Sequence, residues 1–180
     1  MGTGHIEQDK LPYNEIRFYK EGNFQKYYAK QLLTHGPDFM GEYHFYVPGV
    51  KLETYDLAPN VRAGALICND AWAYPLASPN GNPYYWRTLR EMGCNIVFVS
   101  ANCTMDVRDN IVYNFHESML RIMAKSYNMH VVVSSACTDM NGVVVQHTQA
   151  PSGIISDTGE WIVKCKEQGM DTVSAEIDFG

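Results

Sequence analysis

Residues 61–68 read VRAGALIC, an apolar run of strand length that ends in a thiol. Two later runs, CNIVFVSA at 94–101 and MHVVVSSA at 129–136, have the same length and character. Continuous apolar runs of this length are typical of strands in a sheet that is covered on both faces. Helical segments separate the three runs, so the sequence predicts an α/β protein with a mixed sheet layered with helices.

The two segments between these strands have the spacing and the ends of helices. Residues 83–93, PYYWRTLREMG, end in Gly93, which is a suitable C′ glycine. Residues 106–128 predict a long helix, which Asp109 or Asn110 is suited to cap. Its apolar side chains recur at helical spacing: Phe115, Met119, Ile122 and Met123.

Hairpins are predicted on both sides of this strand–helix core. Residues 14–30 read as two strands around a Glu-Gly-Asn turn, and residues 152–165 as two strands around Asp-Thr-Gly. Residues 52–57 alternate and predict an edge or hairpin strand, and residues 171–179 predict a last alternating strand. No repeat or linker interrupts the chain, so we expect one domain over residues 1–180.

Composition limits the classes of function. The chain of 180 residues carries a net charge of −6, which argues against a nucleic-acid partner or an anionic membrane, since both require a basic face. Its apolar runs are shorter than the ~20 residues that span a bilayer, and its first residues are polar. Five cysteines without zinc spacing favour reduced thiols and no metal. We therefore expect a cytoplasmic protein that binds a small molecule.

Small polar residues follow the three predicted central strands. Cys68 ends the first, Asn102 follows the second, and Ser134 and Ser135 end the third. Because ligands bind beyond the carboxyl ends of strands in such sheets, these ends form a candidate site. Cys68 is either a buried small hydrophobe or a nucleophile, and the N–H of Asn69 is a candidate oxyanion donor. No local signature links any of the six histidines to this thiol.

The order of several motifs gives a more specific indication. YYAKQLL at 27–33, GEYHFYVPG at 41–49 and GALICNDAW at 64–72 follow one another as they do in the nitrilase, or carbon–nitrogen hydrolase, superfamily, which the chain resembles. Later segments fit the same family, so the resemblance covers nearly all 180 residues: 89–101, 115–137, 150–162 and 173–179.

The resemblance implies a nitrilase-like αββα sandwich that pairs into a homodimer or higher homo-oligomer. It implies hydrolysis of a non-peptide amide, carbamoyl or nitrile bond through a covalent acyl-enzyme, without metal or cofactor. It assigns Cys68 as the nucleophile, Lys30 as the cation that stabilises the oxyanion, and Glu42 as the residue that orients the lysine and the substrate. From the residues alone, Lys30 could equally be a solvated strand lysine and Glu42 a surface charge in a loop.

Aromatic side chains near these motifs are candidates for the substrate pocket. Tyr43 and Trp72 are predicted to contact the substrate, although packing under loops is the other interpretation; Phe45 and Tyr74 are weighed in the same way. Asn102 is predicted to face the site if the strand ends meet.

One part of the family pattern has no counterpart. The family's general-base glutamate lies upstream of the segment that resembles residues 1–15, together with the first strands and helices, and Glu7 is the nearest substitute in sequence. General acid–base catalysis contributes roughly 10²–10⁴-fold to a rate. Three interpretations follow: a piece of a longer enzyme, a short protein completed by a partner, or a catalytically silent relative with a binding or assembly role.

Overall fold

The computed structural model describes most of the chain. The described ranges are 11–34, 41–73, 84–102, 110–136, 138–140, 143–146, 150–166 and 169–180, with backbone alone at 110–113, 138–140 and 143–146.

A six-stranded mixed sheet forms the centre of the molecule, with the strand order β10-β9-β6-β5-β4-β3. The three predicted apolar runs are its parallel strands: β4 (Val61–Ile67), β5 (Ile96–Ala101) and β6 (His130–Ser135). The antiparallel strands lie outside them: β3 (Thr54–Ala58) beside β4, then β9 (Gly153–Ile155) and β10 (Trp161–Lys164) beside β6. The predicted mixed α/β sheet is confirmed.

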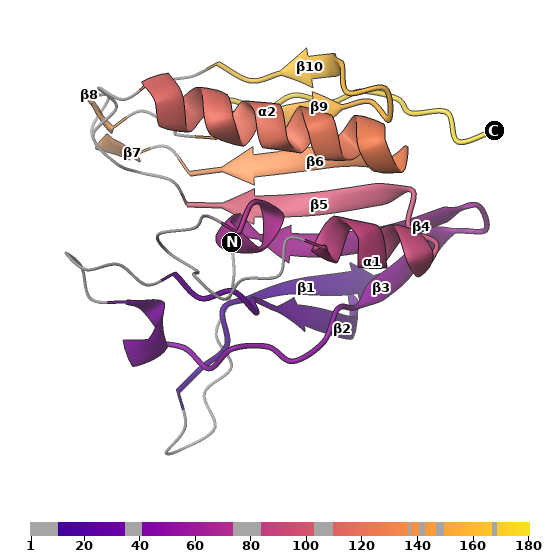
Figure 1. Cartoon of the computed structure of the whole chain (residues 1–180), viewed down its shortest axis with the longest axis horizontal. Coiled ribbons are helices and arrows are strands. Elements are labelled where there is room, and N and C mark those ends of the chain that lie inside the picture. The colour runs from indigo at the N-terminus through magenta and orange to yellow at the C-terminus, as the bar shows by residue number, and fades with distance from the viewer. Residues whose placement is uncertain are drawn as a thin grey trace.

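Two helices connect the parallel strands and lie on one face of the sheet (Figure 1). They are α1 (Tyr85–Glu91) and α2 (Asn110–Tyr127). Because β4, β5 and β6 are neighbours in one direction across the sheet, right-handed crossovers place both helices on the same side. Gly93 has a φ of 87°, as the predicted helix end requires, whereas the alternative cap Asp109 lies outside the described residues.

The core lies between these helices and the sheet. Trp86 and Leu89 of α1 and Leu120 of α2 are buried against Val97 and Val131 of the sheet. The described residues thus supply one helical layer and one sheet layer of the αββα arrangement that the resemblance implies. None of the described helices is long and apolar enough to cross a membrane.

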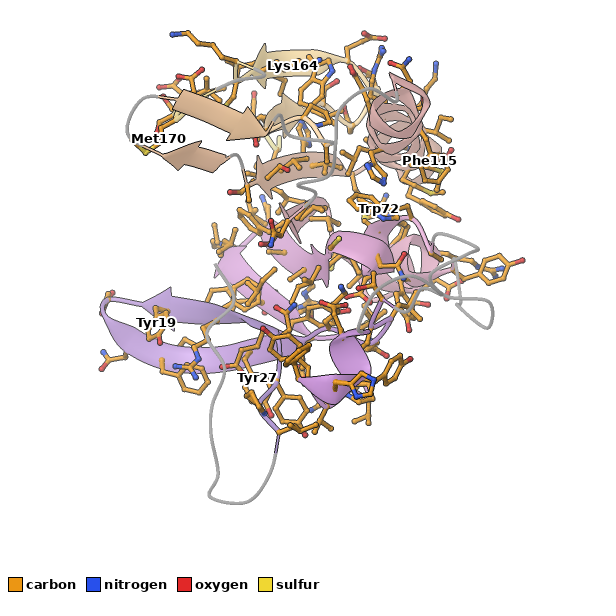
Figure 2. All side chains as sticks on the ribbon, turned by 90° about the vertical axis from the view of Figure 1, so that its left-hand side faces the viewer. Tyr19, Tyr27, Trp72, Phe115, Lys164 and Met170 are labelled. Atoms are coloured by element: carbon orange, nitrogen blue, oxygen red, sulfur yellow. The ribbon has the colours of Figure 1, made fainter. Side chains whose placement is uncertain are left out.

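A separate hairpin lies beside the β3 side of the sheet (Figure 1). Its strands are β1 (Glu15–Lys20) and β2 (Asn23–Ala29), paired antiparallel around Glu21 and Gly22, which both have positive φ. The predicted turn is confirmed. Figure 2 shows Tyr19 and Tyr27 on this hairpin, and both rings are exposed.

In the carboxyl-terminal part of the chain, one predicted strand is wrong and one small sheet was not predicted. Residues 171–179 are not a strand: they are described, but no sheet ladder includes them, although Phe179 contacts the His130 ring at 5.2 Å. Apolar alternation reports which side chains face the protein, whereas a strand also needs a neighbouring backbone. The small sheet of β7 (Thr138–Met140) and β8 (Val143–Gln146) was not predicted. The Asn-Gly dipeptide between these strands in the sequence is the signal that was overlooked.

The hairpin of β9 and β10 generates a test of the fold. Gly153 has a φ of 146°, and a Cβ there would lie 2.9 Å from the Cα of Lys164. Gly169 also has positive φ, 74°, but has nothing within 4 Å of a Cβ. We expect Gly153→Ala to lower the free energy of unfolding by about 3 kcal/mol, from strain plus overpacking. Gly169→Ala, the control, costs about 1 kcal/mol. Urea denaturation measures both, and equal losses would contradict the described packing.

Candidate active site

Cys68 lies at the turn where β4 passes into the short 3-10 helix η2 (Cys68–Ala71). The register pairs Ile67 with Ser100 and Ser100 with Ser134, so the carboxyl ends of the three parallel strands meet at one edge, as predicted. Cys68 has a φ of 49°, a left-handed conformation that non-glycine residues rarely adopt. Such strained positions concentrate at functional sites.

Lys30 follows β2 and is almost completely buried, with 2% of its surface exposed. Its backbone is fixed on both sides: its N–H donates to the Asn14 carbonyl at 2.8 Å, and its carbonyl accepts the Gly49 N–H at 2.7 Å. Gly49 has to be a glycine, because a Cβ there would lie 2.9 Å from the carbonyl carbon of Ala29. A solvated strand lysine is therefore the wrong interpretation of Lys30.

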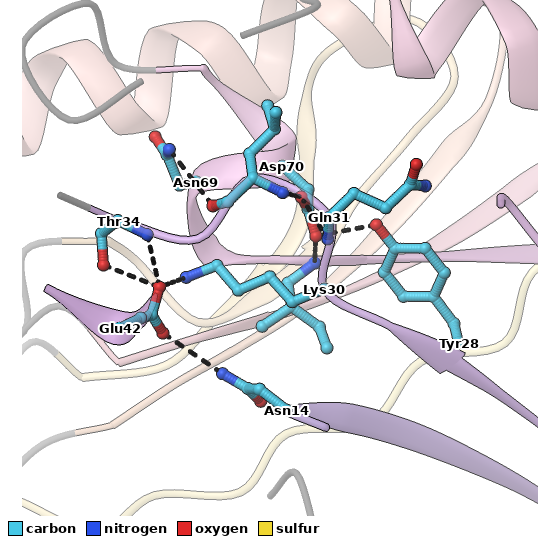
Figure 3. A network of polar contacts seen from close by, with 10 residues as sticks. Asn14, Tyr28, Lys30, Gln31, Thr34, Glu42, Asn69 and Asp70 are labelled. Carbon is cyan, nitrogen blue, oxygen red and sulfur yellow. Dashed lines mark hydrogen bonds and ion pairs between the residues drawn. The ribbon is translucent and has the colours of Figure 1, made fainter. Parts of the chain in front are cut away.

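Glu42 begins the 3-10 helix η1 (Glu42–His44) and holds the lysine. Its Oε2 lies 2.5 Å from Lys30 Nζ and also accepts hydrogen bonds from the N–H and the hydroxyl of Thr34, at 2.6 and 2.7 Å. Its Oε1 accepts a longer bond from Asn14 Nδ2, at 3.4 Å. Figure 3 shows this cluster, in which Glu42 is an internal partner of Lys30 rather than a surface charge.

The charges in this cluster support one another. Burial lowers the pKa of Lys30, but the negative charges of the Cys68 thiolate and of Glu42 raise it, and the net pKa is above its usual value. Burial raises the pKa of Glu42, but the charge of Lys30 and the Thr34 hydrogen bonds lower it by more. The net pKa of Glu42 is therefore below its usual value. An ammonium ion and a carboxylate are therefore maintained close to the thiol at neutral pH.

Asp70 is a further polar residue of this region to which the sequence analysis assigned no role. Its side chain is buried, 1% exposed, and its two oxygens accept hydrogen bonds from Tyr28, Gln31, Leu32 and Ile67 (Figure 3). The signal in the sequence is its position two residues after Cys68, within the quoted stretch GALICNDAW.

The other predicted site residues lie at varied depths. Asn69 is buried, follows Cys68 directly and donates from Nδ2 to the Leu32 carbonyl at 3.4 Å. Trp72 is buried, and its ring stacks on the His116 ring of α2 at a centroid distance of 4.1 Å, close to Phe115 in Figure 2. Tyr43 is half exposed next to Glu42.

Of four further candidates, two are exposed and two lie outside the described residues. Asn102 is exposed just after β5, and Phe45 is exposed just after η1, whereas Tyr74 and Glu7 lie outside the described residues. The structure therefore brings together Cys68, Lys30, Glu42 and Asn69. In the part of the chain that the structure describes, no group of three or more His, Cys, Asp or Glu side chains is arranged to hold a metal ion.

Comparison with known proteins extends this description. A family model described as carbon–nitrogen hydrolase matches residues 1–180. Among curated proteins, no sequence matches the chain. Solved structures do match. A glutamine-dependent NAD+ synthetase from Acinetobacter baumannii is 16% identical with a TM-score of 0.71, over 94% of this chain and 29% of that one.

Two smaller enzymes have similar structures. The NitN amidase from Nesterenkonia sp. AN1 is 18% identical with a TM-score of 0.70, over 93% of this chain and 58% of that one. A carbon–nitrogen hydrolase from Helicobacter pylori G27 is 17% identical with a TM-score of 0.69, over 94% of this chain and 57% of that one. The chain thus spans less than two thirds of each neighbour, and at these identities the likeness shows the fold.

The Lys30–Glu42 pair predicts how stability depends on pH. Glu42→Gln leaves the buried ammonium without its carboxylate, so we expect the free energy of unfolding to fall by about 3 kcal/mol at pH 7. Since the folded-state pKa of Glu42 lies below 4.5, its contribution is present above that pH and is lost as pH falls through the folded pKa. The contribution of Lys30 is lost only as pH rises through a folded-state pKa above 10.5.

Urea denaturation of wild type and Glu42→Gln between pH 3 and pH 8 measures this difference. It should be constant down to about pH 5 and then shrink. Glu53→Gln is the matched control, since Glu53 pairs at 2.5 Å with the exposed Lys51, and exposed pairs contribute little. A difference that stays constant down to pH 3 would contradict the ionised pair.

Proposed function

Because this chain belongs to the carbon–nitrogen hydrolase family, we propose that it hydrolyses a non-peptide amide, carbamoyl or nitrile bond through an acyl-enzyme on Cys68. The observation that carries the proposal is the buried ammonium of Lys30, held by Glu42 within electrostatic range of the Cys68 side chain. A lysine is buried with its charge only where a partner compensates the loss of hydration, and Glu42 is that partner here.

In the proposed reaction a general base, which is a glutamate in this family, first takes the proton of the Cys68 thiol, because only the thiolate attacks a carbonyl carbon. The sulfur–carbon bond forms and the carbonyl electrons move to oxygen, where Lys30 and the N–H of Asn69 stabilise the negative charge. The carbon–nitrogen bond then breaks, and the protonated general base gives its proton to the leaving amine. Water hydrolyses the thioester, releases the acid and restores the thiol. Glu42 keeps Lys30 in place through these steps.

Small aliphatic amides are the substrates that we favour. The neighbour from Nesterenkonia sp. AN1 is an amidase, and in one of its mutants acrylamide has added at the active-site cysteine. Another of its mutants is in complex with butyramide. Tyr43 and Asn102, which are exposed, are proposed to contact the substrate, and the buried Trp72 is proposed to contact or support it. The homodimer or higher homo-oligomer and the cytoplasmic location also stay predictions.

A second candidate is a catalytically silent relative that binds a ligand or a partner at the same strand ends. Turnover and thiol reactivity separate the two candidates, because a silent relative has no need of an activated thiol.

The first test of the proposal is ammonia release from a panel of small aliphatic amides. We expect Cys68→Ala to lower the rate on the order of 10⁴-fold or more, as loss of a nucleophile does in hydrolases. Cys94→Ala is the matched control, since Cys94 is a buried thiol whose pKa burial raises to about 11. Equal rates for wild type and Cys68→Ala, or no release by wild type, would favour the silent relative.

Labelling with iodoacetamide tests the lysine. At pH 7 we expect Cys68 to react faster than Cys94, and Lys30→Met to slow Cys68 roughly tenfold, since one pH unit in thiol ionisation changes the thiolate fraction tenfold. Lys51→Met is the control, because Lys51 is 75% exposed. Mass spectrometry of the cysteine peptides gives the rates. If Cys68 and Cys94 react alike in wild type, the nucleophile assignment is wrong.

A further inference from the structure

We propose that Asp70 is a positioning residue: it fixes the segment that carries Lys30 against the turn that carries Cys68. This inference rests on the proposed function and deepens it, because the family resemblance assigned roles to Cys68, Lys30 and Glu42 alone. The ion pair with Glu42 sets where the ammonium points, but nothing in that pair ties it to the thiol. The shortest hydrogen bonds between the two segments go to the carboxylate of Asp70, and the Asn69 Nδ2 bond to the Leu32 carbonyl, at 3.4 Å, is a longer additional contact.

The hydrogen bonds of Asp70 join both reactive segments. Oδ1 accepts the N–H of Leu32 at 2.7 Å and the N–H of Gln31 at 3.2 Å, which are the peptides that directly follow Lys30. Oδ2 accepts the N–H of Ile67 at 3.2 Å, the peptide just before Cys68. The same oxygen accepts the Tyr28 hydroxyl at 2.7 Å, which adds β2 to the junction (Figure 3).

Only a group that accepts on both oxygens satisfies all four donors. A carboxylate does so, whereas an asparagine side chain presents an N–H₂ group to one pair of donors and opposes a backbone N–H there. The site is buried, so a backbone N–H that loses this acceptor finds no water to replace it. We therefore expect substitution of Asp70 to separate the Lys30 segment from the Cys68 turn, and not only to weaken their contact.

The titratable groups around Asp70 come from three elements. Tyr28 lies on β2 and Lys30 follows it, Tyr85 lies on α1, and Cys68 precedes Asp70 on η2. Burial raises the pKa of Asp70, while the hydrogen bonds of Leu32 and Tyr28 and the charge of Lys30 lower it, with a net rise. Burial and the neighbouring Asp70 raise the pKa of Tyr28 far above its usual value, so its hydroxyl remains a donor.

The test is the pH dependence of Cys68 alkylation by iodoacetamide in the full chain, with Asp70→Asn and Tyr28→Phe. Asp70→Asn should move the midpoint of the pH profile upward and slow alkylation at pH 7 about tenfold, because Lys30 no longer faces the thiol. Tyr28→Phe removes one of the four hydrogen bonds and should move the midpoint in the same direction by less. Ammonia release should fall in parallel.

Glu117→Gln is the matched control for stability. Glu117 also ties two elements together, since it accepts from Trp161 Nε1 at 2.7 Å and from Lys164 Nζ at 3.2 Å, but it has no contact with the thiol cluster in the described structure. Glu117→Gln should lower the melting temperature and leave the alkylation profile of Cys68 at its wild-type position. A purely structural role of Asp70 would give the same pattern as this control.

Three results would overturn the inference. An unchanged profile in a folded Asp70→Asn would show that Asp70 serves stability alone. A downward shift would show that its negative charge acts on the thiol and that its hydrogen bonds do not position Lys30. If Asp70→Asn does not fold, the alkylation profile of Tyr28→Phe decides the question. A wild-type profile in Tyr28→Phe would then contradict the positioning role of Asp70. A wild-type Cys68 that reacts no faster than Cys94 would instead contradict the proposed function itself.

Discussion

The burial of one ammonium group is the constraint on which the rest of the site depends. An unpaired lysine at 2% exposure would lose its proton or destabilise the fold, since the charged form is heavily penalised away from water. The chain meets this requirement with Glu42, whose own oxygens are held by Thr34 and Asn14. The ammonium group is thereby fixed in charge and in direction, which a solvated lysine is not.

The same constraint explains why the site is built across two parts of the fold. Cys68 stands at the end of a strand in the central sheet, whereas Lys30 follows a strand of the separate hairpin. A sheet fixes its own strands through ladders, but no ladder joins these two elements. Buried polar contacts have to replace it, and the four hydrogen bonds of Asp70 supply most of them, with a longer one from Asn69 to the Leu32 carbonyl. Because the two groups lie on separate elements, the position of the Lys30 ammonium relative to the Cys68 thiol depends on these contacts.

Sequence reasoning succeeded where one local pattern determined one element. The three apolar runs became parallel strands because a continuous run of that length has no other stable environment in such a sheet, and Cys68 therefore fell at their common edge. The pairing of Lys30 with Glu42 came from the family resemblance, since the two residues lie twelve positions apart and the chain between them carries no signal of contact. Thr34 and Asp70 were overlooked because hydrogen bonds to backbone leave no periodic trace. The strand predicted at 171–179 failed because its pattern says nothing about a partner.

The proposed hydrolysis requires that the thiol of Cys68 carries the acyl group during turnover. The most direct measurement is the mass of the Cys68 peptide after a reaction with a small aliphatic amide is quenched rapidly with acid. A fraction of that peptide should be heavier by the acyl group of the substrate, with the Cys94 peptide unchanged. Release of ammonia without the added mass on the Cys68 peptide would contradict an acyl-enzyme on Cys68. Absence of both ammonia and the added mass would contradict hydrolysis of these amides.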